Sequence, residues 1–407
     1  MSIGILTSTQ LTQDLARKSF SGYITRLMPN GQAPLFAMTS MLKSDTALAP
    51  EHGFFIKTML FPQLVISAAG QTASDTVFNV VSTSNVLPGM LMRVDTTGEN
   101  VIINSVVSGT QVSVQRGIGN VSAQAIAANV NCYSIGNAYE ESSLRPSPLL
   151  INAVRITNLT HIFRNTWAVS GSMSSVQMLA GDSNVAESKQ DCSMFHAVDI
   201  EKQLFFGQKS QGVRNGQVFR TMDGLISIVG NLANYPTSLY SSPNVFTAGG
   251  TTNYTQLQGF LEPTLNQATD PKVANERVVF CGGVAKRVIN DIGRLNGTYY
   301  LTDGQTSWGL QFTTFKTARG TFRLIEHPLF NSNSSWAKMA VVVDLSSFNT
   351  AYLGDRKTQY KEFNSTNNAA DNGIDAIGGT LTTELTCLVR NPPANAVIYN
   401  LTQGAAG

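Results

Sequence analysis

The longest regular pattern in this sequence is helical and lies between Ser183 and Phe206. Asp182 or Ser183 can cap the start of such a helix, and Gly207 ends it. Apolar residues recur along it at near-helical spacing: Val185, Cys192, Phe195, Val198 and Phe205. Charged residues fall largely on the other faces: Glu187, Lys189, Asp191, Asp199 and Lys202. The pattern therefore predicts one long amphipathic helix whose apolar stripe packs on a sheet.

The region before this helix has the pattern of strands. A β-rich run extends from Phe54 to Leu60, between Gly53 and Pro62. Short strand-like runs then recur between turn residues, at Val77–Val81, Met90–Val94, Val101–Val107 and Gln111–Val114. Even spacing of short strands predicts a small all-β module such as a partial barrel. Two further extended segments, Leu149–Thr157 and His161–Ser170, resemble long strands that return from that module.

The first fifty residues are polar and are interrupted by Pro29, Pro34 and Pro50. A short helical pattern runs from Thr12 to Phe20, but glycines and prolines interrupt the residues after it. Such a segment cannot build a core of its own. We therefore expect an extended arm that becomes ordered by lying on a neighbouring molecule.

The last 170 residues alternate between helix and strand patterns. Asn253 can cap a helix that carries Leu257, Leu261 and Leu265, and this helix passes Pro263 only with a kink or a break. Arg277–Cys281 has the pattern of a buried strand, and Gly282–Gly283 leads from it into a helix with Val284, Val288 and Ile292 on one face. Further strands are expected at Leu310–Phe315, Thr321–Glu326, Met339–Asp344, Leu381–Arg390 and Ala396–Leu401. The chain as a whole is therefore predicted to be α+β.

Charged residues are scarce, at 13% of the chain against 42% hydrophobic residues. A soluble monomer uses charge to keep its surface wet and apart from its copies. The shortage therefore indicates a surface that is covered in part, most simply by other copies of the chain. The net charge of +2 comes from scattered residues. Without a basic stripe, sequence-specific nucleic-acid binding is not expected, whereas loose contact with DNA needs no such stripe.

The four cysteines, Cys132, Cys192, Cys281 and Cys387, lie far apart and form no CxxC pair. This spacing favours buried free thiols in a reducing cytoplasm over disulfides or a zinc ribbon. The first ten residues lack the basic start and apolar run of a signal peptide, and no apolar run reaches the length of a membrane span. We therefore expect a protein that is made in a cytoplasm and stays soluble.

Residues with catalytic potential are dispersed. His52, His161, His196 and His327 are isolated from one another, and no HExxH, phosphate-loop or GxSxG motif occurs. The run 249–252 before a predicted helix could hold an anion, but a turn that feeds a helix cap is the better interpretation. We therefore predict no catalytic, cofactor or metal site. An enzyme assembled from distant residues, such as a carbohydrate hydrolase, remains an alternative.

Four stretches carry a family resemblance. They are Gly98–Val101 with Gln115–Gly117, Asp199–Gly207 with Arg220–Leu225, Gly320–Pro328, and Gly379–Thr386 with Asn391–Ala396. In their order and spacing they resemble tailed-phage coat proteins of the Hong Kong 97 type, and within that fold the family typified by the major capsid protein of phage SU-ten. The resemblance covers most of the chain from about Val77 to Leu401, and the first fifty residues match nothing in the family.

The resemblance implies a domain plan for the α+β chain. Residues 1–50 would form the N-terminal arm, and 51–170 an extended loop with a β module inserted at about 77–135. Residues 171–246 would form the peripheral domain with a spine helix at about 183–206, and 247–380 the axial domain. Residues 381–407 would return to the peripheral domain as strands. The arm before Glu51 and the loop up to about Ser170 are then the segments expected to join adjacent subunits.

The resemblance also implies a function. The chain would be a major capsid protein whose hexamers and pentamers form an icosahedral shell around double-stranded DNA, with a portal and possibly scaffolding or decoration proteins as partners. Assembly would take place in the bacterial host cytoplasm, with no membrane involved. Lys57 could form the covalent cross-link known in some relatives, although a solvated strand lysine is the better interpretation. The alternatives are an encapsulin-like compartment and a β-rich virion protein such as a tail fibre.

Overall fold

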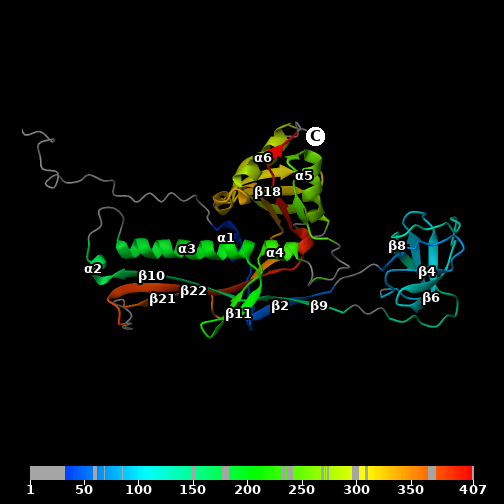
Figure 1. Cartoon of the computed structure of the whole chain (residues 1–407), viewed down its shortest axis with the longest axis horizontal. Coiled ribbons are helices and arrows are strands. Elements are labelled where there is room, and N and C mark those ends of the chain that lie inside the picture. Colours follow the sequence, from blue (N-terminus) through cyan, green and yellow to red (C-terminus); the bar gives the residue numbers. More distant parts are fainter. Residues whose placement is uncertain are drawn as a thin grey trace, which may run out of the picture. The chain divides into compact units, whose positions relative to one another are not determined.

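The computed structural model describes residues 33–57, 62–67, 69–84, 86–148, 152–176, 183–231, 235, 242–266, 270, 272, 275–295, 302–307, 310–364 and 373–405. The chain divides into two compact units. The larger unit comprises Met1–Phe54 and Arg155–Gly407, and the smaller comprises Phe55–Val154. Figure 1 shows the elements of both units.

The smaller unit is a six-stranded antiparallel sheet in the order β3-β8-β5-β6-β7-β4. Its strands are β3 (Gln63–Val65), β4 (Val77–Asn79), β5 (Met90–Val94), β6 (Asn100–Ser108), β7 (Gln111–Gln115) and β8 (Asn131–Asn137). Fourteen buried apolar side chains form its core, among them Phe78, Met92 and Ile103. The four predicted runs are therefore strands of one module. The expected start at residue 77 is wrong, because β3 pairs with β8 and so brings Gln63–Val65 into the sheet.

Within the larger unit, a five-stranded sheet has the order β1-β20-β22-β10, with β21 also pairing with β22. The strands are β1 (Asp45–Ala47), β10 (His161–Ser170), β20 (Phe348–Leu353), β21 (Gln359–Phe363) and β22 (Ala376–Val389). The long helix α3 (Asn184–Phe206) packs along β10 and β22 (Figure 1). Ser183 caps α3 by accepting a hydrogen bond from the Ala186 amide, and Gly207 follows its last residue. This confirms the predicted helix and both of its ends.

The face that α3 buries differs from the predicted stripe. Phe195 is wrong as a core residue, because 56% of its surface is exposed. His196 takes the position toward the sheet instead, where its Nδ1 lies 2.7 Å from Asn165 Oδ1 and its Nε2 lies 2.7 Å from Thr383 Oγ1. Glu201 is fully buried as well, on a different side of the helix, where its carboxylate meets α1 and His327. Two polar side chains with buried partners therefore contribute to the surface that α3 buries.

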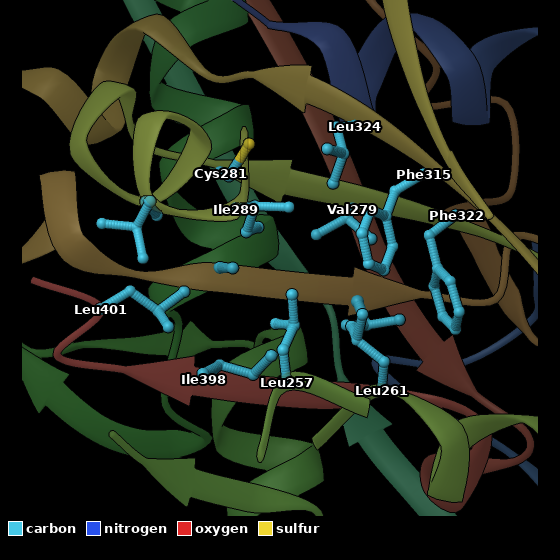
Figure 2. Packing of buried hydrophobic residues seen from close by; sticks show 14 of the residues in the cluster. Leu257, Leu261, Val279, Cys281, Ile289, Phe315, Phe322, Leu324, Ile398 and Leu401 are labelled. Atoms are coloured by element: carbon cyan, nitrogen blue, oxygen red, sulfur yellow. The ribbon is translucent and has the colours of Figure 1, made fainter. Parts of the chain in front are cut away.

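The second sheet of the larger unit has seven strands in the order β13-β23-β19-β15-β18-β17-β16. They are β13 (Val245–Thr247), β15 (Glu276–Cys281), β16 (Thr302–Ser307), β17 (Leu310–Lys316), β18 (Thr321–Glu326), β19 (Ala340–Val343) and β23 (Ala396–Tyr399). Helices α5 (Tyr254–Leu261) and α6 (Gly283–Leu295) add Leu257, Leu261 and Ile289 to its core (Figure 2). The predicted buried strand at Arg277–Cys281 is β15, in the middle of this sheet.

The start and the end of α5 follow the sequence prediction. Asn253 Oδ1 accepts from the Gln256 amide at 2.9 Å, and Gln256 Oε1 accepts from the Asn253 amide at 3.2 Å, which is a reciprocal capping box. The helix ends at Leu261, and a 3-10 turn, η1 (Glu262–Leu265), carries Pro263. Proline has no amide hydrogen to continue the α-helical ladder, which accounts for the break.

The predicted plan placed residues 247–380 in one domain and 381–407 in the other. The strands of the two sheets do not follow that boundary. β20 and β21, which fall within 247–380, pair with β22 in the five-stranded sheet. β23, which falls within 381–407, pairs with β13 and β19 in the seven-stranded sheet. Strand partners decide which sheet a segment joins, and here the chain crosses between the sheets after β19 and again after β22.

Shorter elements complete the described residues. Two-stranded pairs are formed by β2 (Glu51–Ile56) with β9 (Val154–Leu159), β11 (Ser210–Arg214) with β12 (Gln217–Thr221), and β14 (Thr251–Thr252) with β24 (Gln403–Gly404). The remaining helical turns are α2 (Gly171–Ser174), α4 (Leu225–Gly230), η3 (Pro328–Ser332), η4 (Trp336–Lys338) and η5 (Pro392–Ala394). The strands expected at Phe54–Leu60 and Leu149–Thr157 overlap β2 and β9, and residues 58–60 and 149–151 lie outside the described residues.

The helix α1 (Pro34–Met41) corrects the expectation that Pro34 interrupts regular structure. Proline is well accommodated at the first helical position, since the amide hydrogen it lacks has no partner inside the helix there. Two amides of the first turn, those of Leu35 and Phe36, donate to the two carboxylate oxygens of Glu201 at 2.8 and 2.7 Å. The helical pattern expected at Thr12–Phe20 lies outside the described residues.

His327 completes this arrangement, which we call the Glu201 clasp and which consists of Glu201, His327 and the amides of Leu35 and Phe36. His327 Nε2 lies 2.8 Å from Glu201 Oε1, and both side chains are fully buried. His327 Nδ1 accepts from the Leu329 amide at 3.2 Å, which leaves Nε2 to donate to the carboxylate. His327 therefore caps η3 through Nδ1 and takes part in the clasp through Nε2.

The smaller unit contains a second buried carboxylate. Glu99 is fully buried and accepts from Arg116 Nε at 3.0 Å and from Arg116 Nη2 at 2.6 Å. The amides of Gly117 and Gln124 donate to it as well, at 3.1 and 3.3 Å. Burial by itself raises the pKa of Glu99, but the bonds from Arg116 and the two amides outweigh it and hold the pKa below its usual value.

Replacing Glu201 by alanine tests the clasp. We expect the larger unit to lose about 3 kcal/mol or more, because two α1 amides and His327 lose a buried acceptor. Hydrogen exchange read by mass spectrometry should show faster exchange in Pro34–Met41. Lys202→Ala, at the exposed neighbouring position, is the control and should leave that exchange unchanged. Unchanged protection of α1 in Glu201→Ala would show that the clasp does not hold this helix.

Acidification tests Glu99. The folded pKa lies below that of the unfolded chain, so the stabilisation is complete above the unfolded pKa and is lost as the pH falls through the folded pKa. The quantity to compare is the protection factor, which is the exchange rate of the unstructured chain divided by the measured rate at the same pH. We expect the protection factors of residues 91–116 to fall more steeply on acidification in the parent than in Glu99→Gln. The variant should already be less protected at neutral pH. Asp95→Asn, an exposed position, should behave like the parent. Identical pH profiles for the parent and Glu99→Gln would contradict this assignment.

Candidate assembly surface

The histidines singled out in the sequence serve packing and hydrogen bonding at separate places. His161 stacks on Phe163 with ring centroids 4.3 Å apart, and burial lowers its pKa. Burial likewise lowers the pKa of His196 between α3 and the five-stranded sheet. His327 belongs to the Glu201 clasp, and His52 lies in β2. Among the described residues, no group of three or more histidine, cysteine or carboxylate side chains is placed to hold a metal ion.

The four cysteines are buried and free. Burial raises the pKa of Cys132, Cys281 and Cys387 to about 12, and it raises the pKa of Cys192 as well. Only the thiolate form of cysteine acts as a nucleophile or a metal ligand. Because their pKa values are raised, these four side chains are protonated at neutral pH. The expectation of buried free thiols is confirmed.

The glycine-threonine run 249–252 leads into strand β14 and then into the Asn253 cap of α5. The Gln256 amide that would face an anion donates to Asn253 Oδ1 instead. The run therefore has the turn-and-cap role that the sequence favoured over an anion site.

A third buried carboxylate lies on the five-stranded sheet. Glu384 in β22 is 1% exposed and accepts from Thr160 Oγ1 at 2.9 Å, from Arg220 Nη2 at 3.2 Å and from Arg356 Nε at 3.1 Å. Arg220 belongs to β12, so Glu384 ties the base of the β11–β12 hairpin to the sheet. The base is fixed further by the Lys209 amide, which donates to Asp223 Oδ1 at 2.9 Å.

The β11–β12 hairpin presents apolar side chains from this fixed base. Val213 and Val218 form a cross-strand pair with 71% and 53% of their surfaces exposed, and Phe219 is 45% exposed beside Gly212. Asn215 and Gly216 form the turn, both with positive φ. Exposed apolar side chains on a hairpin that is fixed in place mark it as a candidate contact surface.

Sequence reasoning did not single out this hairpin. A usable signal exists, because Asn215-Gly216 is a strong two-residue hairpin turn with Val213 two positions before it and Val218 two positions after it. The segments that were expected to join subunits also contain exposed large apolar residues. The three most exposed of those described are Leu48 at 93%, Leu144 at 92% and Phe55 at 71%. Their role in assembly stays a prediction.

The remaining expectations concern membranes and Lys57. None of the helices in the described ranges is long and apolar enough to cross a membrane. Lys57 follows the last residue of β2 and is exposed. The structure neither requires nor tests a cross-link at that lysine.

Comparison with known proteins covers almost the whole chain. The model of the SU10 major capsid protein family matches residues 5–402. A major capsid protein of Pseudomonas phage PaMx41 is 37% identical, with 98% of this chain and 96% of that protein covered.

Several solved structures are similar at low identity. A chain from Mycobacterium phage Bobi is 10% identical, with 99% of this chain and 100% of that chain covered and a TM-score of 0.49. The capsid of an empty GTA particle is 8% identical, with 98% and 100% covered and a TM-score of 0.47. The SrpI encapsulin of Synechococcus elongatus is 11% identical, with 63% and 80% covered and a TM-score of 0.41.

The family match and the phage relative confirm the resemblance that the four sequence stretches carried. This family consists of structural capsid proteins and not of enzymes. The chain belongs to the SU10 major capsid protein family.

Proposed function

We propose that this chain forms hexamers and pentamers that close into an icosahedral capsid around double-stranded DNA. The match of residues 5–402 to a major capsid protein family is the observation that carries the proposal. The apolar surface on the β11–β12 hairpin supports it physically, because Val213, Val218 and Phe219 are held on a fixed base with nothing of the described chain over them. Closed symmetric assembly covers such a surface on every copy at once.

The domain plan is part of this proposal. The five-stranded sheet with α3 would be the peripheral domain, and the seven-stranded sheet with α5 and α6 the axial domain that lines each capsomer axis. The smaller unit would be the β module of the extended loop. The net charge of +2 and the scattered basic residues support non-specific contact with packaged DNA over sequence recognition.

Portal, scaffolding and decoration proteins would be further partners of a capsid of this kind, and its assembly would take place in the bacterial host cytoplasm. An encapsulin-like compartment is the second candidate, because it uses the same kind of closed shell. Electron microscopy of purified particles, together with their nucleic-acid content, separates the two candidates. Particles that enclose protein cargo and no nucleic acid would favour the compartment.

Sedimentation velocity of the expressed full chain tests the proposal itself. We expect capsomers or particles of megadalton mass, because the chain has apolar surface that its own described residues leave open. A protein that remains monomeric at high concentration would contradict a shell-forming function.

Charged substitutions in the hairpin test which surface assembles. We expect Val213→Asp with Val218→Asp to prevent particle formation while leaving thermal unfolding close to that of the parent, since both side chains are mostly exposed in one copy. Val176→Asp, at a valine that is 55% exposed and lies outside the segments expected to join subunits, is the control for adding an exposed charge. Normal particles from the hairpin variant would remove the hairpin from the assembly contacts.

A further inference from the structure

The face of the five-stranded sheet that points away from α3 contains a groove of about 500 Å³. Side chains alternate across a strand, and Phe163, Trp167 and Val169 of β10 are buried on the α3 side. Ile162 and Arg164 therefore project from the opposite face, where Thr382 of β22 lies opposite Arg164. β21 places Gln359 and Lys361 on the same face through its pairing with Thr382 and Thr380.

The groove has more positive than negative charge. Arg164 and Lys361 are exposed, and within the described part of the chain neither has an ion-pair partner. Arg356, which also lines the groove, shares the buried Glu384 carboxylate with Arg220. Glu362 also lines the groove and forms an ion pair with Lys189, so three cations line the groove against one carboxylate. Like charges that converge on one site repel each other unless an anion joins them, so the groove favours a negatively charged occupant.

Apolar surface in the same groove narrows the chemistry of that occupant. Ile162 is 44% exposed, and the Phe363 ring lies over Gly378, so closely that an added Cβ there would overlap it. A phosphate backbone would satisfy Arg164 and Lys361 but leave Ile162 in water. A peptide with carboxylates and one large apolar side chain fits both parts of the groove.

The chain itself carries such a peptide in the segment Tyr139–Leu144. Tyr139 fixes its start, since the Tyr139 hydroxyl donates to the Pro88 carbonyl at 3.3 Å. The Ser143 amide donates to the Glu140 carbonyl at 3.2 Å and so closes a turn. Glu140 and Glu141 are exposed and form no ion pair with a described residue. Leu144 is 92% exposed, and Arg145 after it leaves the segment with a net negative charge.

We propose that the acidic turn Tyr139–Leu144 of one copy binds in the Arg164–Lys361 groove of a second copy, with Glu140 and Glu141 facing the two cations and Leu144 facing Ile162. Glu141 and Leu144 are three positions apart, so their separation is at most about 10 Å, and Ile162 and Arg164 of one strand face are about 7 Å apart. This contact rests on the proposed shell, in which many copies present both surfaces. The contact would add complementary charges to the apolar contacts between copies. Complementary charges fix which surfaces pair and in which register.

Charge reversal on both sides tests the contact in the full-length protein. We expect Arg164→Glu with Lys361→Glu, and separately Glu140→Lys with Glu141→Lys, to raise the concentration needed for half-assembly by about ten-fold or more, because two attractive pairs become repulsive. The chain with all four substitutions should assemble close to the parent. Lys202→Glu with Arg287→Glu, at two exposed cations outside the groove, is the matched control. We expect it to assemble like the parent, and we expect that adding Glu140→Lys with Glu141→Lys to it gives the defect of the reversed turn without compensation.

Mixing separates a contact between copies from one within a copy. Equal amounts of the two double variants should assemble together, since the reversed turn of one then meets the reversed groove of the other. If the chain with all four substitutions assembles and the mixture forms no oligomer that contains both variants, the contact lies within one copy and the proposal is overturned. Assembly of each double variant like the parent would overturn it too.

The same variants also test whether the groove binds DNA phosphate instead, and they separate failure of this contact from failure of the proposed function. A short DNA duplex that binds the parent but not Arg164→Glu with Lys361→Glu, while assembly is unaffected, would assign the groove to phosphate instead. If the parent itself does not assemble, the proposed function fails. If the parent assembles and the reversals have no effect, only this contact fails.

Discussion

The position of one buried carboxylate controls how the larger unit is put together. Glu201 receives hydrogen bonds from amides at residues 35 and 36 and from His327, so three segments that are far apart in sequence meet on one side chain of α3. Burying a carboxylate in this way is costly unless several donors compensate it, and they do so only in one arrangement. The clasp therefore specifies the register of α1 on α3 and the entry to η3, and Phe205 and Phe330 enclose it with rings 5.1 and 4.5 Å from His327.

The stretches that carried the family resemblance contain side chains of this kind. Glu99 and Arg116 form the buried pair of the smaller unit, Glu201 and His327 form the clasp, and Glu384 joins Arg220 to the sheet. Asn395, fully buried, accepts from the Asp344 amide at 2.8 Å and donates to the Asn391 carbonyl at 2.9 Å. A buried polar group restricts its neighbours more than an apolar one, because its partners must supply matching donors and acceptors. This restriction gives a physical reason for the motifs to consist of these residues.

Local sequence signals predicted most helices and strands. Contacts between residues far apart in the sequence determined helix α1, the buried face of α3 and the sheet that each late strand joins. The caps of α3 and α5, the break at Pro263 and most strands depend on a few neighbouring residues, so the sequence contains what is needed to find them. Helix α1 depends on acceptors 165 and 166 positions away, which no local pattern reveals. The exchange of Phe195 for His196 on the buried face depends on Asn165 and Thr383. The sheet membership of β20 and β23 is likewise a matter of distant strand pairing.

The few charged residues of this chain are divided between buried positions and the surface. The chain has only 26 acidic residues, and Glu99, Glu201 and Glu384 are turned inward, where each organises several segments. Order inside a subunit is thus achieved by a few strong polar contacts. The surface is left with apolar side chains, such as Val213 and Val218, and with few charges, whose individual contacts are weak. Weak contacts suit a closed shell, because misplaced subunits can dissociate while the repetition of each contact around the symmetry axes stabilises the complete particle.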